Sequence, residues 1–457
     1  MVWTTIGALI GLGLSIFLII KKLNPTYSLI LGAVVGGIIG GIGLSIDGTI
    51  NVLEILPHTV DSMIGSTAGT GIRGVVPAIL RILTAGVLAG VLIETKAADV
   101  LSQSIIKIFG AKLALLALAL SAMVLTAVGV FVDVAIVTIA PIALTVAKQT
   151  HLSPMAMLLA LVGGGKAGNM ISPNPNTIIT SSNLNVPLFD LMLAGLPSAI
   201  VGIALSVLLS MWLNKRYKAK NAVAIAGDVF HLQTDEDIDD LPKLWAALVA
   251  PLVVIVLLAL NPILSSLVDD APSTIVDPLI ALPIGGIVGC ICMKKAKYLG
   301  QYVSQGILKM TPTAIMFVGT GAISGIIQAS NLSNDIISLF SKINLSVVWF
   351  APLAGILFSA ATASTTAAST IASASFNNII DGKLVFVDGS ISNLSAAAML
   401  HTGSATLDHL PHGTFFHATG GSVNMTVKER LRLIPLETVI GVCMTVVSTL
   451  VYGFFIK

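Results

Sequence analysis

The chain has 457 residues, of which 55% are hydrophobic and 10% are charged, and its formal net charge is +2. Soluble domains carry about 25% charged residues, and the mean hydropathy here is +0.97. This composition excludes a water-soluble globule and predicts a polytopic protein surrounded by lipid. The 42 glycines and the low aromatic content favour an all-α bundle over a β-barrel, which needs aromatic girdles. No basic block is long enough to indicate nucleic-acid binding, and the three cysteines all lie in apolar segments, so no metal site is expected.

Uncharged apolar runs mark the expected membrane spans, since a helix needs about 20 such residues to cross a bilayer. The runs are residues 3–20, 28–44, 75–93, 113–147, 152–182, 187–213, 243–262, 276–292, 303–327, 346–376, 391–419 and 434–455. Segments 113–147 and 346–376 are too long for one crossing. Each is either two short spans or a helical hairpin, and we predict re-entrant hairpins with tips near 128–134 and 361–366 that meet at mid-membrane.

The loops between these spans differ in charge, and the difference predicts the orientation. The basic loops, which share one side if the N-terminus is outside, contain Lys21, Lys22, Lys96, Lys107, Lys112, Lys215, Arg216, Lys218, Lys220, Lys294, Lys295, Lys297, Lys428, Arg430 and Arg432. The opposite loops contain Asp47, Glu54, Asp61, Asp269, Asp270, Asp335 and Asp381. The basic side is therefore predicted to be cytoplasmic, with the first hairpin on that side and the second on the external side.

This topology divides the chain into two inverted repeats of five spans plus one hairpin each. The predicted boundaries are 1–213 for the first repeat, 214–242 for a cytoplasmic connector and 243–457 for the second repeat. The run GVLIETKAADVLSQSII from Gly90 resembles GIIQASNLSNDIISLF from Gly325, which supports the repeat weakly. Each repeat also contains a predicted broken span, 152–182 in the first and 391–419 in the second.

Polar backbone at membrane depth is costly unless it lines a cavity, and broken helices at matching positions of inverted repeats indicate a central transport site. Half-helix N-termini favour an anion such as a carboxylate, and Lys166 adds a full positive charge. The segment 163–177 is expected to be broken by its run of three glycines at 163–165 and by its two prolines. The predicted substrate-binding residues are Lys166, Asn169, Ser172, Asn174, Asn176, Thr177, Thr365, Thr366, Thr402 and Ser404.

An acid alone in an apolar segment is functional by default, and Asp133 is such an acid. We predict Asp133 as the proton-coupling residue, ahead of Asp408 and His412. Structural alternatives remain open at each place: Asp133 as a hydrogen-bonding partner, Lys166 as a snorkelling lysine, and the Ser/Thr-rich run 359–375 as a helix-packing surface. Arg81 is expected to pair with another group of the scaffold. Gly32, Gly36 and Gly40 are expected to let helices pack closely.

Two segments resemble the gluconate permease family. FVDVAIVTIAPIAL at 131–144 is similar to the family's Phe-Asp-Val hairpin signature, and TLDHLPHG at 406–413, followed by the basic VKERLRLIP, is similar to its Leu-Asp-x-Leu-Pro-His segment. The resemblance extends over essentially the whole chain. It implies that Asp133 takes the position of the family's hairpin acid, and that Asp408, Pro411 and His412 take positions in its second broken span.

The resemblance also implies a place near the wider ion-transporter superfamily, with two hairpins, two unwound spans, a homodimer and an elevator movement. It implies proton-coupled uptake of gluconate or a related hydroxylated monocarboxylate across a bacterial inner membrane, without a cofactor. The segment 163–177 departs from the His- and Pro-rich segment of gluconate transporters, so the identity of the acid stays open. Sodium coupling is the alternative within transport. An enzyme is disfavoured because no H-E-x-x-H motif is present, and a non-transporting scaffold does not explain two matched broken spans.

Overall fold

The computed structural model describes most of the chain. The described residues are 2–21, 23–65, 70–110, 113–217, 241–267, 275–330, 332, 335, 347–374, 379–380, 383–386, 389–411 and 413–456. The predicted connector 214–242 therefore lies outside the described residues except at its two ends. The predicted coupling residue His412 also lies outside them.

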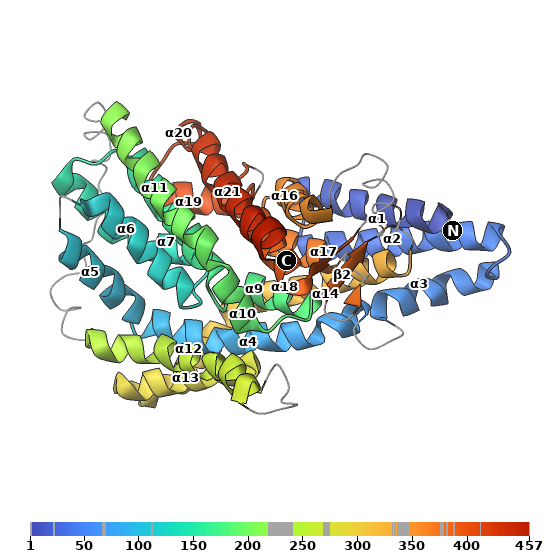
Figure 1. Cartoon of the computed structure of the whole chain (residues 1–457), viewed down its shortest axis with the longest axis horizontal. Coiled ribbons are helices and arrows are strands. Elements are labelled where there is room, and N and C mark those ends of the chain that lie inside the picture. Colours follow the sequence, from blue (N-terminus) through green and yellow to red (C-terminus); the bar gives the residue numbers. More distant parts are fainter. Residues whose placement is uncertain are drawn as a thin grey trace.

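The described residues are almost entirely helical (Figure 1). The first half contains α1 Val2–Ile20, α2 Pro25–Ile46, α3 Ile55–Ile64, α4 Gly71–Glu94, α5 Ala97–Phe109, α6 Ala114–Ala127, α7 Val132–Thr150, α8 Pro154–Met170, α9 Pro175–Asn183, α10 Leu188–Ala194 and α11 Leu196–Tyr217. The second half contains α12 Leu244–Leu267, α13 Pro278–Cys292, α14 Leu299–Gln328, α16 Phe350–Thr362, α17 Thr365–Ala374, α18 Asn393–Ser404, α19 Thr414–Ser422, α20 Val427–Leu431 and α21 Ile434–Thr449. Short 3₁₀ turns lie at Val52–Glu54, Ala296–Tyr298 and Val347–Trp349, and a π-helical turn at Leu450–Phe455 continues α21.

Six helical segments of the described chain are long and apolar enough to cross a membrane, and several shorter apolar helices accompany them. The predicted class, a helical polytopic membrane protein, is thereby confirmed. Besides the five-residue α20, two helices lie where no span was predicted: α3 and α5, which follow α2 and α4. Both are short, with 10 and 13 residues, and polar residues interrupt their apolar face. A search for uncharged runs therefore misses them.

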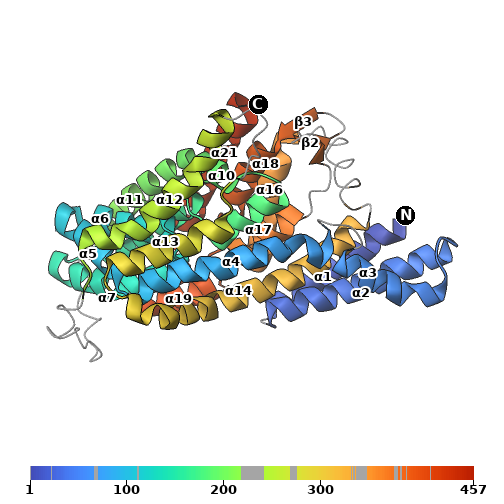
Figure 2. The ribbon, with the colours of Figure 1, turned by 90° about the horizontal axis from the view of Figure 1, so that it is seen from below.

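Long helices packed through glycines form one side of the molecule. Figure 2 shows α1, α2, α4 and α14 running alongside one another, and α13 packs against α4. A Cβ at Gly306 of α14 would overlap the carbonyl oxygen of Gly86 in α4, and Gly7 of α1 meets the backbone at Gly36 in the same way. Small residues let membrane helices approach closely, so the predicted packing role of the α2 glycines is confirmed.

Both segments that were too long for one crossing are pairs of helices with a break inside the predicted tip. The first break separates α6 from α7 at Gly129, whose φ is 105°, and the second separates α16 from α17 at Ala363, whose φ is 46°. A Cβ at Gly129 would lie 3.9 Å from Pro173 of the first broken span, and Gly413 of the second broken span packs on Ala363. Each tip thus lies against the broken span of its own half. The meeting of the two tips at mid-membrane, and the boundaries of the two repeats, stay predictions.

Three short strands follow the second helix pair and depart from the all-helical expectation. They are β1 Ile379–Ile380, β2 Lys383–Phe386 and β3 Gly389–Ser392, in one antiparallel sheet of order β1-β2-β3. Lys383 pairs with Ser392 and Phe386 with Gly389. In the sequence, Asp381-Gly382 stands between Ile380 and Lys383, which pair with each other, and such an Asp-Gly pair is a hairpin signal. The strands are too short to alter the helical class.

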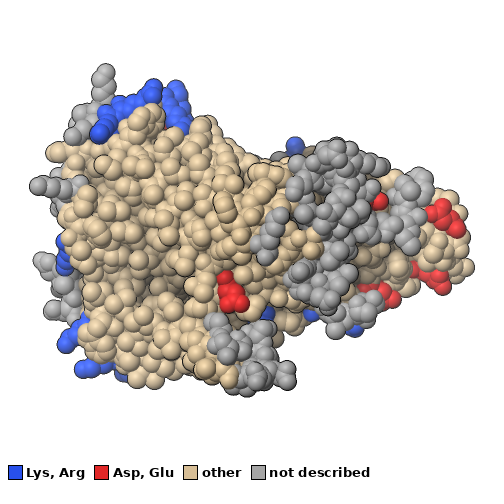
Figure 3. All heavy atoms as spheres, viewed as in Figure 1, with Lys and Arg blue, Asp and Glu red and all other residues tan. Residues whose placement is uncertain are grey.

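Charge is distributed unevenly along the molecule. In Figure 3, Lys and Arg atoms gather toward the end where α5, α11 and α20 terminate, while acidic atoms gather at the opposite end, near α3. Exposed residues at the two ends include Lys107, Lys215 and Lys428 on one side and Asp47 and Glu54 on the other. This separation is the one that the positive-inside prediction requires.

Candidate functional site

The first broken span consists of α8 and α9, separated by residues 171–174. Asn174 caps α9, because its Oδ1 accepts hydrogen bonds from the backbone N–H groups of Asn176 at 2.8 Å and Thr177 at 3.2 Å. Pro175 follows at the first helical position, where proline is favoured. The sequence therefore ends one helix and starts the next within a few residues.

The expectation that the glycines also break this span is wrong. Residues 163–170 are the last turns of α8, and the glycines there are packing positions. A Cβ at Gly164 would overlap the backbone of Ala119 in α6, and a Cβ at Gly168 would overlap Met123. Glycine is tolerated inside membrane helices when it permits such contacts. Lys166 is therefore fixed on a rigid helix and is 1% exposed.

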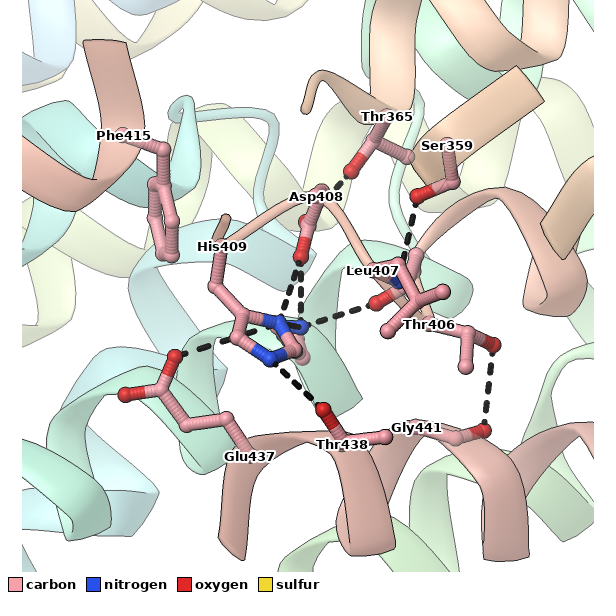
Figure 4. A network of polar contacts seen from close by, with 12 residues as sticks. Ser359, Thr365, Thr406, Leu407, Asp408, His409, Phe415, Glu437, Thr438 and Gly441 are labelled. Atoms are coloured by element: carbon pink, nitrogen blue, oxygen red, sulfur yellow. Dashed lines mark hydrogen bonds and ion pairs between the residues drawn. The ribbon is translucent and has the colours of Figure 1, made fainter. Parts of the chain in front are cut away.

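The second broken span consists of α18 and α19, separated by residues 405–413. The non-helical stretch is held by α16, where the Ser359 hydroxyl accepts a hydrogen bond from the Leu407 N–H at 3.1 Å. Asp408 and His409 project from this stretch, and both are buried. In Figure 4 the Asp408 carboxylate lies between the side chains of Thr365 and His409.

Lys166 and Asp408 join the two broken spans through a buried ion pair. The Lys166 Nζ lies 2.5 Å from Asp408 Oδ1 and donates a hydrogen bond to the Ala405 carbonyl at 2.8 Å. The other carboxylate oxygen of Asp408 accepts a hydrogen bond from the Thr365 hydroxyl of α17 at 2.6 Å. One carboxylate thus connects the first broken span, the second broken span and the second helix pair.

His409 extends this cluster toward α21. Its Nδ1 lies 2.9 Å from Lys166 Nζ, and its Nε2 lies 3.2 Å from the Ile434 carbonyl and 3.1 Å from the Thr438 hydroxyl. A lysine ammonium only donates and a carbonyl only accepts. The Lys166 and Ile434 contacts favour a proton on Nε2, whereas the Asp408 Oδ1 atom, 3.4 Å from Nδ1, is an acceptor that favours a proton on Nδ1.

A second buried ion pair lies behind His409. Glu437 Oε2 is 3.9 Å from His409 Nδ1, and both Glu437 oxygens accept hydrogen bonds from Arg430. The Arg430 guanidinium also donates to the Thr419 hydroxyl at 3.3 Å and lies over the Phe416 ring, 5.0 Å from its centroid. Arg430 and Glu437 are at most 1% exposed. The basic loop 427–435 therefore contributes a buried charge as well as exposed ones.

Five predicted residues form an amide and hydroxyl cluster beside the ion pair. The Asn174 amide donates to Asn169 Oδ1 at 2.7 Å, the Asn176 amide to the same oxygen at 3.4 Å, and the Thr366 hydroxyl to Asn176 Oδ1 at 2.6 Å. Thr177 Oγ1 lies 3.4 Å from His401 Nε2 of α18. The cluster, like the ion pair, joins elements from both halves of the chain.

The remaining predicted residues are placed differently. Thr402 and Ser404 donate hydrogen bonds to carbonyls of their own helix, at Ala398 and Leu400. The Ser172 hydroxyl is buried and has no hydrogen-bond partner within the described part of the chain. Asp133 lies in the first turn of α7 and accepts a hydrogen bond from the Val134 N–H at 2.9 Å.

Sequence reasoning did not select His409, Arg430 or Glu437 as substrate-binding or proton-coupling residues. A charged residue that becomes buried looks like any other residue of a basic loop, so the sequence carried only a weak signal, the acid Glu437 inside an apolar span. Among the described residues, no group of three or more His, Cys, Asp or Glu side chains could hold a metal ion.

Comparison with known proteins identifies the family. The model of the GntP family permeases matches residues 3–455. The chain belongs to the GntP permease family. A Haemophilus influenzae protein described as an uncharacterized transporter is 46% identical over 452 residues, 99% of each chain. The gluconate permease of Zymomonas mobilis is 24% identical over 448 residues, which cover 93% of this chain and 92% of that one.

A solved structure supports the fold. The YdaH transporter of Alcanivorax borkumensis, described as having an unusual topology, matches with a TM-score of 0.57 at 17% identity, over 88% of this chain and 89% of that chain. Membership in a permease family confirms that the protein is a transporter and not an enzyme. It is a multi-pass protein of the inner membrane.

Proposed function

We propose that this permease imports a small hydroxylated monocarboxylate such as gluconate together with a proton. The observation that carries the proposal is the buried Lys166–Asp408 ion pair, which joins the two broken spans. The printed name of the Zymomonas mobilis relative supports the class of substrate. The ion pair supports the coupling to a proton.

The substrate carboxylate and Asp408 compete for Lys166. Lys166 is the cation of the site, and its ammonium already binds a carboxylate, a carbonyl and an imidazole nitrogen. An ammonium has three protons to donate, so an incoming carboxylate must replace one of these partners. The neighbouring Asn169, Asn176 and Thr366 then offer amide and hydroxyl groups for the substrate hydroxyls.

Replacement leaves Asp408 without its cation, and this is the step that requires a proton. An unpaired buried carboxylate costs several kcal/mol. Protonation removes this cost, and the Thr365 hydroxyl can still hydrogen-bond to the neutral acid. The proton and the substrate therefore bind together, which is the defining property of a symporter.

The charge balance fits the same cycle. One proton moving with one monoanion is electroneutral, so the pH gradient drives uptake, and a second proton would add about 2.3 kcal/mol per 100 mV. Asp133 and His412 remain candidates for such a second proton. Sodium coupling stays the alternative, because buried carboxylate and amide oxygens are also sodium ligands.

The packing supports an elevator with a static and a moving part. We propose that the glycine-packed helices α1, α2, α4, α13 and α14 are the static part. In this proposal the helix pairs, the broken spans, α11 and α21 move together as a unit. A homodimer formed through the static part completes the proposal, in accordance with the resemblance to the superfamily.

Uptake by purified protein in liposomes tests the proposal. Radiolabelled gluconate is expected to accumulate when the outside is acidified in sodium-free buffer, and Lys166→Met is expected to abolish the accumulation. Thr402→Val is the matched control, because the Thr402 hydroxyl bonds only within its own helix. Accumulation driven by a sodium gradient at equal pH, and not by a pH gradient, would contradict the proton assignment. Failure of all tested sugar acids and short hydroxy acids to bind would contradict the substrate class.

A further inference from the structure

Two cavities lie apart from the Lys166–Asp408 site and share three lining residues. The larger has a volume of about 580 Å³ and the smaller about 200 Å³, and Arg81, Ser182 and Asn185 line both. The larger cavity is bounded by α4, by the end of α14, by the end of α9 and by the end of α17. Arg81 is its only charged wall residue in the described part of the chain.

The cavities lie on the predicted external side of the central site. Arg81 is about 15 Å along α4 from Gly71, and α4 runs from the predicted external side inward, at roughly 1.5 Å per residue. Asn183 ends α9, whose first turn at Asn176 belongs to the amide cluster. A nine-residue helix is about 13 Å long. The larger cavity therefore lies one short helix away from the proposed substrate site.

Arg81 is arranged as a carboxylate receptor. Its Nε donates to Asp277 Oδ1 at 3.0 Å and its Nη2 to Asp277 Oδ2 at 2.6 Å, a two-pronged contact. The remaining guanidinium nitrogen, Nη1, donates a hydrogen bond to the Ser182 hydroxyl of α9 at 2.6 Å. The predicted pairing of Arg81 within the scaffold is thus observed, with an added contact to the first broken span.

The partner of Arg81 is replaceable. The side chains of Arg81 and Asp277 are 22% and 32% exposed, so water can take up the hydrogen bonds that either group loses. Asp277 has a second role, since its Oδ1 caps α13 by accepting a hydrogen bond from the Leu279 N–H at 2.8 Å. That role persists when Arg81 turns toward another anion.

The other polar groups of the cavity suit a hydroxylated molecule. Asn183 donates an amide hydrogen bond to the Ser373 hydroxyl at 2.8 Å, and the Gln328 amide donates to the Ser324 hydroxyl at 3.0 Å. An amide group has two donor protons, so Asn183 has a second proton for the cavity. The Gln328 amide also donates to the Ala374 carbonyl at 3.5 Å, and its Oε1 accepts a hydrogen bond from the Gly71 N–H at 3.3 Å, so Gln328 offers the cavity the second lone pair of Oε1. Substrate hydroxyls can therefore be bound beside the guanidinium.

We propose that the larger cavity is an external capture site for the transported hydroxy acid, with Arg81 as the receptor of its carboxylate. The carboxylate takes the place of Asp277 on the guanidinium, and the hydroxyls bind Asn183 and Gln328. From there the substrate passes along α9 to Lys166. This inference rests on the proposed function for the chemical class of the ligand.

Two substitutions of opposite expected effect test the capture site against a purely structural ion pair. Arg81→Gln is expected to raise the KM for gluconate uptake about tenfold, because the receptor charge is lost. Asp277→Asn is expected to lower the KM about threefold, because the competing charge is lost from a partly exposed pair. Asparagine is also a good helix cap, so α13 keeps its start. If Arg81 and Asp277 served only to hold helices together, both variants would impair uptake and thermal stability alike, and that result would overturn the proposal.

A binding measurement separates this inference from the proposed function. Gluconate binding to purified Lys166→Met protein is expected to persist as a weak phase that Arg81→Gln removes and Asp277→Asn strengthens. A residual phase insensitive to Arg81, or none at all in a protein whose wild type binds gluconate, would overturn the capture site alone. Absence of gluconate binding to the wild type would overturn the proposed substrate and with it the ligand of this cavity.

Discussion

Neutralising Asp408 while retaining its shape is the sharpest test of proton coupling. Asp408→Asn imitates the protonated acid, so Lys166 becomes available to the substrate at any pH. The variant is expected to bind gluconate with an affinity that no longer depends on pH and to exchange it across the membrane. It is not expected to accumulate gluconate in response to a pH gradient.

The size of the effect follows from the burial of the pair. Lys166 and Asp408 are 1% and 7% exposed, and removing one partner of a buried pair commonly costs about 3 to 5 kcal/mol. Lys166→Met is therefore expected to weaken gluconate binding by at least about 10²-fold, at about 1.4 kcal/mol per tenfold change. Lys166→Met combined with Asp408→Asn is expected to regain thermal stability relative to Lys166→Met alone, because no unpaired charge remains, without regaining binding.

Counterflow and pH-jump uptake in liposomes, together with calorimetric binding at several pH values, measure these outcomes. Asp133→Asn is the parallel variant, since Asp133 is the carrier predicted from the sequence. Uphill uptake by Asp408→Asn with the proton dependence of the wild type would refute the coupling argument. If Asp133→Asn alone lost accumulation, the proton would be assigned to Asp133.

Three further variants test the packing and the charges. Glu437→Gln is expected to lower the melting temperature strongly, because it removes the partner of a buried guanidinium, at a cost of about 3 to 5 kcal/mol; an unchanged melting temperature would contradict the burial of the pair. Gly306→Ala is expected to destabilise the protein by forcing α14 away from α4, whereas Gly300→Ala in the same helix meets open space and is expected to be neutral; equal melting temperatures for the two would count against the close contact. Ala363→Gly is expected to stabilise the protein by about 1 kcal/mol, because glycine tolerates the left-handed backbone at the tip, while Ala367→Gly inside α17 is expected to have the opposite effect; a lower melting temperature for Ala363→Gly would refute the strain at the tip.

The helical class, the two long broken segments and the break before Pro175 could be predicted because each depends on local chemistry. Length and hydropathy give the spans, and Asn174-Pro175 gives a helix start. The role of the glycines of α8 could not be predicted, because these glycines look like helix breakers when the sequence is read alone. They are packing positions because Ala119 and Met123 lie against them on the neighbouring helix. A local sequence pattern does not show which residues become neighbours in the folded protein.

The polar residues also divide into features that the sequence predicted and features that only the fold shows. Lys166 and Asp408 were each selected from the sequence, and the matching broken spans placed both near one central site, but no sequence pattern showed that the two side chains pair. Their pairing, and the place of Thr365 against Asp408, come from the fold. Arg81 was expected to pair, but its link to Ser182 depends on where α9 ends relative to α4.

The proposed path contains two cations, and the difference in their burial locates the coupling. Arg81 and Lys166 each bind a carboxylate of the protein that the substrate must replace. At Arg81 the pair is partly exposed, so the released Asp277 can be hydrated and stays charged. At Lys166 the pair is buried, so water cannot hydrate the Asp408 carboxylate when it is released. In the proposed path a proton neutralises this carboxylate instead. In the proposed path, the exchange of carboxylates is therefore expected to be independent of protons at Arg81 and coupled to a proton at Lys166.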